Sequence, residues 1–143
     1  MKYEPLNNIG VSIHTVDLDI TKFVNHKLKA IQLTNEQNLL MSLLWEREGI
    51  SQNEIAAKLN KDKAGIARMI STLEKKGYIR RKSCPSDKRS VEVYLTDEGK
   101  KLGEDVIPIN KSIIQAINKG LTDEEMAELR RLLRKVRENV NNS

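Results

Sequence analysis

The sequence predicts a mainly α fold with a central three-helix core and one β-hairpin, on three observations. Apolar residues recur at three- and four-residue steps along most of the chain, which is the spacing of one-faced helices. Three segments begin with a Ser/Thr-x-x-Glu/Gln pattern, which marks a helix N-terminus, at Thr34, Ser51 and Thr122. Two short segments are instead rich in β-branched and aromatic residues, which favour strands. The length of 143 residues predicts a single domain, 1–143.

Start and stop residues mark the expected elements. Asn, Ser, Thr and Asp side chains accept hydrogen bonds from first-turn amides, and glycine after a helix adopts the left-handed conformation easily. In chain order we expect helices over 7–29 (capped by Asn7 or Asn8), from Thr34 to Gly49, over 51–59, over 62–76 (capped by Asp62 or Asn60, ended by Gly77), from Thr96 to Gly120 and over 122–140. A strand over 78–81, a loop over 83–88 and a strand over 91–95 precede the fifth helix, which Pro108 should bend or break.

Charge is distributed unevenly along the chain. The net charge is +5, but residues 58–89 hold eleven basic and three acidic side chains, and the remaining 111 residues have a net charge of −3. The segment 58–89 therefore has a net charge of +8. It covers the junction between the third and fourth helices, the fourth helix and the hairpin, an arrangement typical of a helix-turn-helix with a wing. A charge run is often just a solvated surface, but here the concentration favours DNA as the partner.

Composition excludes several classes of protein. No apolar run approaches the ~18 residues of a transmembrane helix, and the first residues have no signal-peptide core, so we expect a cytoplasmic protein. His14, His26 and Cys84 have no metal-ligand spacing, and no nucleotide-binding motif occurs, so no metal site or cofactor is expected. An enzyme that uses these three residues is a remote alternative, and a winged helix for protein contact is disfavoured by its basic face.

Five motifs follow one another along the chain: Leu33-Thr34-x-x-Gln37-x-x-Leu40, Asn53-Glu54-Ile55-Ala56-x-x-Leu59, Leu73-Glu74-Lys75-Lys76-Gly77-Tyr78-Ile79-x-Arg81, Asp87-Lys88-Arg89-Ser90 and Tyr94-Leu95-Thr96-x-x-Gly99. Taken in this order, they resemble those of the MarR family of winged-helix transcriptional regulators. The resemblance covers nearly the whole chain and implies a winged helix-turn-helix lobe over 34–96, dimerisation helices over 1–33 and 97–143, and a homodimer on a palindromic operator. We expect such a regulator to act as a repressor.

The expected contacts with double-stranded DNA come from the fourth helix and the wing. The resemblance implies that Arg89 enters the minor groove and that Asp87 orients it. Ala64 and Gly65 stand where related chains often have Ser or Thr, so base contacts cannot be transferred to them, although Gly65 could allow close approach to DNA. The DNA-binding candidates are Lys61, Asp62, Lys63, Gly65, Arg68, Met69, Thr72, Lys75, Arg81, Lys82, Asp87, Lys88 and Arg89.

A small anionic or aromatic effector is a further expectation from the resemblance. Its candidate residues are His14, Asp17, Trp45 and Arg47, at mutually facing parts of the first two helices, where ordinary packing is the alternative. Cys84 lies beside basic residues and could be reactive, but the resemblance places a redox-sensing cysteine in the first helix, and 7–29 contains none.

Overall fold

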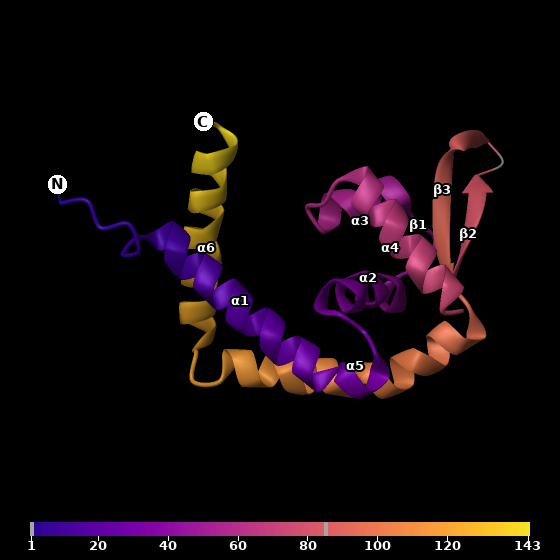
Figure 1. Cartoon of the computed structure of the whole chain (residues 1–143), viewed down its shortest axis with the longest axis horizontal. Helices are drawn as coiled ribbons and strands as arrows, with labels where there is room; N and C mark the ends of the chain where they lie inside the picture. The colour runs from indigo at the N-terminus through magenta and orange to yellow at the C-terminus, as the bar shows by residue number, and fades with distance from the viewer. Residues whose placement is uncertain (1, 85) are drawn as a thin grey trace. The chain divides into compact units, whose positions relative to one another are not determined.

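The computed structural model describes residues 2–84 and 86–143, without the side chains of Cys84, Asp87, Lys88 and Arg89. The described chain confirms a mainly α fold with a winged helix-turn-helix (Figure 1). Its elements in order are α1 (Ile9–Lys27), the short 3-10 helix η1 (Lys29–Ile31), α2 (Asn35–Glu46), β1 (Ile50–Ser51), α3 (Gln52–Lys58), α4 (Lys63–Lys75), β2 (Ile79–Cys84), β3 (Asp87–Leu95), α5 (Asp97–Asn118) and α6 (Asp123–Asn141).

The chain forms two compact units, Met1–Ile109 and Asn110–Ser143. The first unit contains an aliphatic core, since only 3% of the residues are aromatic. Its fully buried side chains come from the segment after α1 and from α2, α3, α4, the sheet and α5, and include Leu28, Leu40, Met41, Leu44, Ile55, Ile66, Ile70, Leu73, Ile79, Val93 and Val106. The predicted division into a 34–96 lobe and flanking dimerisation helices remains a prediction.

Most predicted helix caps are confirmed. Asn8 and Asp62 cap α1 and α4, and Thr34 and Thr122 form complete capping boxes. Ser51 accepts a hydrogen bond from the Glu54 amide, but no return bond closes a capping box, and the Glu54 carboxylate pairs with Arg47 instead. The prediction that Gly49 ends the second helix is wrong. That helix ends at Glu46, and Gly49, with φ +77°, turns the chain into β1 and donates to the Val93 carbonyl.

The sheet is larger than the sequence predicted. Its three antiparallel strands have the order β1-β3-β2, and the two-residue β1 was not predicted because so short a strand shows no periodicity. Residues 83, 84, 87 and 88 belong to strands, so the expected loop over 83–88 is wrong for most of its length. A register shift falls between Ser83 and Cys84. The hairpin of β2 and β3 stands next to α4, and β2 packs against that helix (Figure 1).

The junction between β3 and α5 is tied to the helix-turn-helix by hydrogen bonds. The Thr96 hydroxyl donates to the Gly77 carbonyl at 2.6 Å and accepts from the Gly99 amide at 3.1 Å. The Thr96 amide donates to the Tyr78 carbonyl at 3.0 Å, and the Trp45 indole donates to the Gly99 carbonyl at 3.0 Å. These bonds hold the start of α5 against the ends of α2 and α4. The helix continues through Pro108, so no break occurs there.

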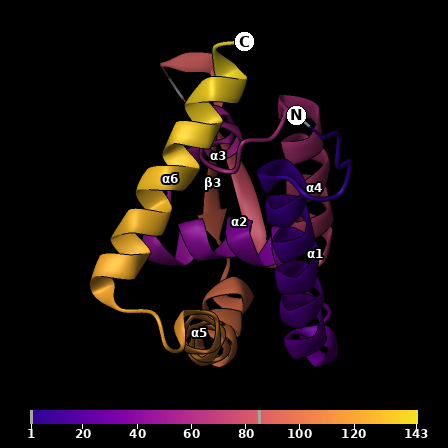
Figure 2. The same ribbon diagram turned by 90° about the vertical axis from the view of Figure 1, so that its left-hand side faces the viewer.

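The terminal helices leave much of their apolar surface exposed. Figure 2 shows α6 as one uninterrupted helix, all of its residues are described, and none is buried. In α1, Val24 is buried, whereas Ile9 and Val16 are exposed. Among residues 2–84 and 86–143, no helix combines the length and apolar character needed to cross a membrane.

Candidate nucleic-acid interface

The helix-turn-helix is built by α3 and α4, which pack against each other across a tight turn. Asn60 adopts the left-handed conformation with φ +53°, and the Lys61 amide donates to the Ala56 carbonyl at 2.9 Å. Asp62 then caps α4 by accepting from the Gly65 amide at 2.6 Å. The start of α4 is therefore fixed by one left-handed residue, one backbone hydrogen bond and one side-chain cap at successive positions.

One side of α4 is buried and the opposite side is basic. Ile66, Ile70 and Leu73, at steps of four and three residues, are 0% exposed. Side chains at other steps turn away from that row and are exposed or half-buried. Four predicted DNA-contacting residues of α4 are exposed: Lys63, Arg68, Thr72 and Lys75. Met69, also expected to point outward, is half-buried.

The structure gives a reason for glycine at position 65 that the sequence did not reveal. A Cβ atom at this position would lie 2.7 Å from Asp62 Oδ1, inside van der Waals contact. The capping carboxylate occupies the space that a side chain at 65 would need. Gly65 thus allows the Asp62 cap, a role that does not depend on close approach to DNA.

The basic side chains of β2 lie on two different faces, because side chains alternate along a strand. Arg80 lies over the Tyr94 ring, 5.0 Å from its centroid, and Lys82 is opposite Glu92. Arg81 lies on the other face, opposite the buried Val93. Arg80 and Lys82 are therefore exposed on the face that carries Tyr94.

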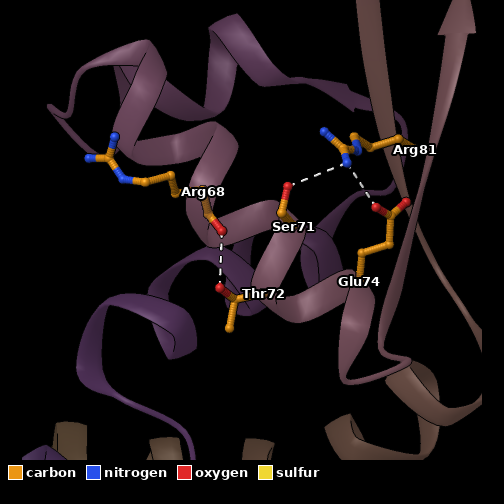
Figure 3. A network of polar contacts seen from close by, with 5 residues as sticks. All are labelled: Arg68, Ser71, Thr72, Glu74 and Arg81. Atoms are coloured by element: carbon orange, nitrogen blue, oxygen red, sulfur yellow. Dashed lines mark hydrogen bonds and ion pairs between the residues drawn. The ribbon is translucent and has the colours of Figure 1, made fainter.

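Arg81 is joined to α4 by polar contacts. Its Nη2 donates to Glu74 Oε1 at 2.9 Å and to Ser71 Oγ at 3.4 Å, whereas Arg68 points to the opposite side of the helix (Figure 3). The Thr72 hydroxyl donates to the Arg68 carbonyl at 3.1 Å. Sequence reasoning grouped Arg81 with Lys82. The sequence did contain a signal that separates the two residues: side chains alternate along a strand, so Arg81 shares a face with the apolar Ile79 and Lys82 does not.

Two further lysines of the basic segment also have protein partners. Lys61 Nζ lies 2.6 Å from Glu36 Oε1, and Lys76 Nζ donates to the Gln32 carbonyl at 2.8 Å. These contacts connect both ends of α4 to the start of α2 and the turn before it. The side chains of Asp87, Lys88 and Arg89, predicted to act at the wing tip, lie outside the described residues, as does that of Cys84.

The four effector candidates are not brought together around one pocket. Trp45 lies against α5 and lines a pocket of about 500 Å³ with Leu95, Ile107 and Pro108. Asp17 lines a different pocket of about 390 Å³ beside the start of α2. Arg47 pairs with Glu54, and His14 is exposed on α1. Further residues at the Trp45 pocket are Leu44, Glu46, Glu48, Lys100, Gly103 and Glu104.

Comparison with known proteins agrees with this geometry. The model of the MarR family matches residues 33–91. The transcriptional regulator HosA of Escherichia coli O111:H- is 34% identical over 104 residues, which cover 73% of this chain and 77% of HosA. The organic hydroperoxide resistance transcriptional regulator of Bacillus subtilis (strain 168) is 29% identical over 132 residues, covering 92% and 85% of the two chains. The crystal structure of a mutant MarR from E. coli complexed with operator DNA matches with a TM-score of 0.82 at 30% identity, covering 94% of this chain and 99% of that chain.

Proposed function

Because the chain belongs to the MarR family of DNA-binding transcriptional regulators, we propose that it represses transcription as a homodimer bound to a palindromic operator. The observation that carries this proposal is the basic surface shared by α4 and the wing. Lys63, Arg68 and Lys75 of α4 and Arg80 and Lys82 of β2 are all exposed. A polyanion is the partner that such a surface attracts.

In the proposed complex, α4 lies in the major groove. Arg68, which points away from the wing, is the candidate for reading guanine edges, because its planar guanidinium matches two acceptors on that base (Figure 3). Lys63 and Lys75 contact phosphates. The exposed start of α4, at Lys63, also carries a partial positive charge that attracts phosphate. Arg89 would enter the adjacent minor groove, oriented by Asp87, and would read its width.

The exposed apolar surface of the terminal helices supports a homodimer. In α6, Leu129 is 49% exposed and Leu132 44%, at the three-residue step of a helix face. In α1, Ile9 is 65% exposed and Val16 55%, seven residues apart. Soluble chains rarely leave such stripes in water, and a second copy of the chain would cover them. Two lobes placed about 34–36 Å apart would then meet successive major grooves, which makes the operator palindromic.

The proposal includes release by a small aromatic effector at the Trp45 pocket, between α2 and α5. Its lining combines the Trp45 ring, Ile107 and Pro108 with the carboxylates of Glu46 and Glu104. A ligand there would move the lobe relative to α5 and favour a state that does not fit two grooves. Benzoate and benzylamine share a ring and differ in charge. Because the carboxylates attract a cation and repel an anion, benzylamine should release DNA at a lower concentration than benzoate. Retention of DNA at saturating amounts of both would exclude them.

A selection from random-sequence duplexes, repeated over a series of salt concentrations, tests DNA binding. We expect one palindromic motif and a steep fall of affinity with salt, because phosphate contacts release counterions. Arg68→Met should relax selection at defined base positions, at a cost of about 1–3 kcal/mol for a bidentate contact. Lys22→Met on α1 makes a comparable change of charge outside the basic segment and should have no effect. Selection of no motif, or binding insensitive to salt, would contradict the proposal.

Sedimentation velocity tests the homodimer. We expect a dimer at micromolar concentration, and Leu132→Asn should shift it toward monomer by removing an apolar contact. Lys135→Asn, on the same helix, is the matched control and should remain dimeric. A wild-type chain that sediments as a monomer would exclude the homodimer, whatever its affinity for DNA.

A further inference from the structure

Arg81 belongs to β2 of the wing and lies on the face of the hairpin that meets α4, the proposed recognition helix. Ile79, two residues earlier on the same face, is 2% exposed, and Val93, the cross-strand partner of Arg81, is 0% exposed. A basic side chain on this face has α4 beside it, since β2 packs against that helix. Lys82, which is opposite Glu92, lies on the outer face of the hairpin, away from α4.

The α4 residues that Arg81 meets are arranged to hold it. Ser71 and Glu74 are three residues apart and therefore adjacent on one side of the helix. Both accept from the same nitrogen, at 3.4 and 2.9 Å, and the Arg81 and Glu74 side chains are 36% and 37% exposed (Figure 3). The guanidinium is thus committed to an ion pair and turned away from the side of α4 that carries Arg68.

The contact is placed where it controls the direction of the wing. It lies two residues before the register shift between Ser83 and Cys84, at the base of the outer part of the hairpin. The three residues of β2 that follow Arg81 span about 10 Å at the usual rise, so a rotation of about 10° there moves the end of the strand by roughly 2 Å. A displacement of that size breaks a hydrogen bond between the wing tip and DNA.

We propose that Arg81 is a positioning residue, which sets the angle between the wing and α4 through Glu74 and Ser71 and makes no contact with DNA. The inference deepens the proposed function and rests on it, because the wing angle matters when hairpin and helix meet one duplex. It also makes Glu74, an acidic residue within the basic segment, a contributor to DNA affinity.

Glu74→Gln tests this inference, because the two possible roles of Arg81 predict opposite signs. If Arg81 contacts phosphate, removal of the neighbouring negative charge strengthens binding. If Arg81 positions the wing, the same substitution weakens it. The probe is the duplex that the wild-type chain selects from the random-sequence pool, and the measurements are Kd and its slope with salt.

For a positioning role we expect Glu74→Gln and Arg81→Met each to weaken binding about fivefold, the factor equivalent to the roughly 1 kcal/mol of an exposed ion pair. The double variant should bind as weakly as either single one, with an unchanged salt slope, because the two side chains act as one unit. Lys82→Met should instead reduce the slope by about 1, as a phosphate contact does. Glu124→Gln on α6 is the control for charge, and circular dichroism verifies that each variant is folded.

The charge-reversed pair Glu74→Arg with Arg81→Glu should recover most of the lost affinity, since it restores the ion pair in the opposite direction. If Glu74→Gln binds as tightly as the wild type or tighter, or if Arg81→Met lowers the salt slope, the positioning role is wrong while the proposed function stands. A wild-type chain that selects no duplex overturns the proposed function, and the role of Arg81 with it.

Discussion

Gly99 offers a direct test of how α5 is joined to the DNA-binding lobe. A Cβ atom at position 99 would lie 2.1 Å from the Tyr78 carbonyl oxygen. Carbon and oxygen normally stay at least about 3.3 Å apart, so Gly99→Ala requires a movement of about 1 Å between two backbone segments. That movement also strains the hydrogen bonds from Thr96 to Tyr78 and from Trp45 to Gly99.

The expected cost follows from two opposing effects. Alanine in a helix is favoured over glycine by about 1 kcal/mol, whereas forcing an extra carbon into a packed site costs roughly 1–3 kcal/mol and backbone cannot rotate away. Because the clash is with backbone, we take the upper end of that range, about 3 kcal/mol. Subtracting the helix gain of about 1 kcal/mol, we expect Gly99→Ala to lower the free energy of unfolding by about 2 kcal/mol and the Tm by about 6 °C. Urea and thermal denaturation, followed by circular dichroism at matched protein concentrations, measure both.

Gly10→Ala is the matched control for Gly99→Ala. Its Cβ atom would lie 3.3 Å from Asn8 Oδ1, the capping atom of α1, which needs to shift by only a few tenths of an ångström and so keeps its bond to the Val11 amide. The same chemical change in α1 should therefore be neutral or stabilise by up to about 1 kcal/mol. If Gly99→Ala were as stable as the wild type or more stable, close backbone contact would not be the reason for glycine at this position.

Three further predictions concern caps and one ion pair. Asp62→Ala should cost about 1 kcal/mol of unfolding free energy and weaken DNA binding, whereas Asp62→Ser keeps the cap; equal urea midpoints for both would contradict this. Thr96→Val loses the bonds to Gly77 and Gly99 and should cost about 2 kcal/mol, and Thr96→Ser should largely restore stability in the same assay. The Arg131 guanidinium lowers the pKa of Glu128, so Arg131→Gln should raise that pKa, as followed by NMR titration; an unchanged pKa would exclude the pair. Because the folded-state pKa is the lowered one, any contribution of the pair to stability is present above the unfolded pKa and is lost as pH falls through the folded value.

Local chemistry was predictable from the sequence, and contacts between elements were less so. A cap such as Asp62 depends on an amide three residues away, so its pattern is visible in the sequence and the structure confirms it. The partners of Arg81 and Trp45 depend on how β2 meets α4 and how α2 meets α5, which no local pattern encodes. The motif residue Gly99 was recognised by resemblance, but its reason, the approach of the Tyr78 carbonyl, required the structure.

The net charge of the basic segment overstates what DNA can meet. Of its eleven basic side chains, Lys61, Lys76 and Arg81 hold Glu36, Gln32 and Glu74 and so stabilise the placement of α4 and the wing. If these three stay with their protein partners, at most eight remain for phosphates in each lobe. Since each phosphate contact contributes about 0.9 to the salt dependence of log K, the slope should not exceed roughly 7 per lobe, or about 14 for a dimer. A steeper slope would mean that the paired lysines or Arg81 leave their partners when DNA binds. A slope within this limit is expected if Lys61, Lys76 and Arg81 keep their protein partners and hold α4 and the wing in place while DNA is bound.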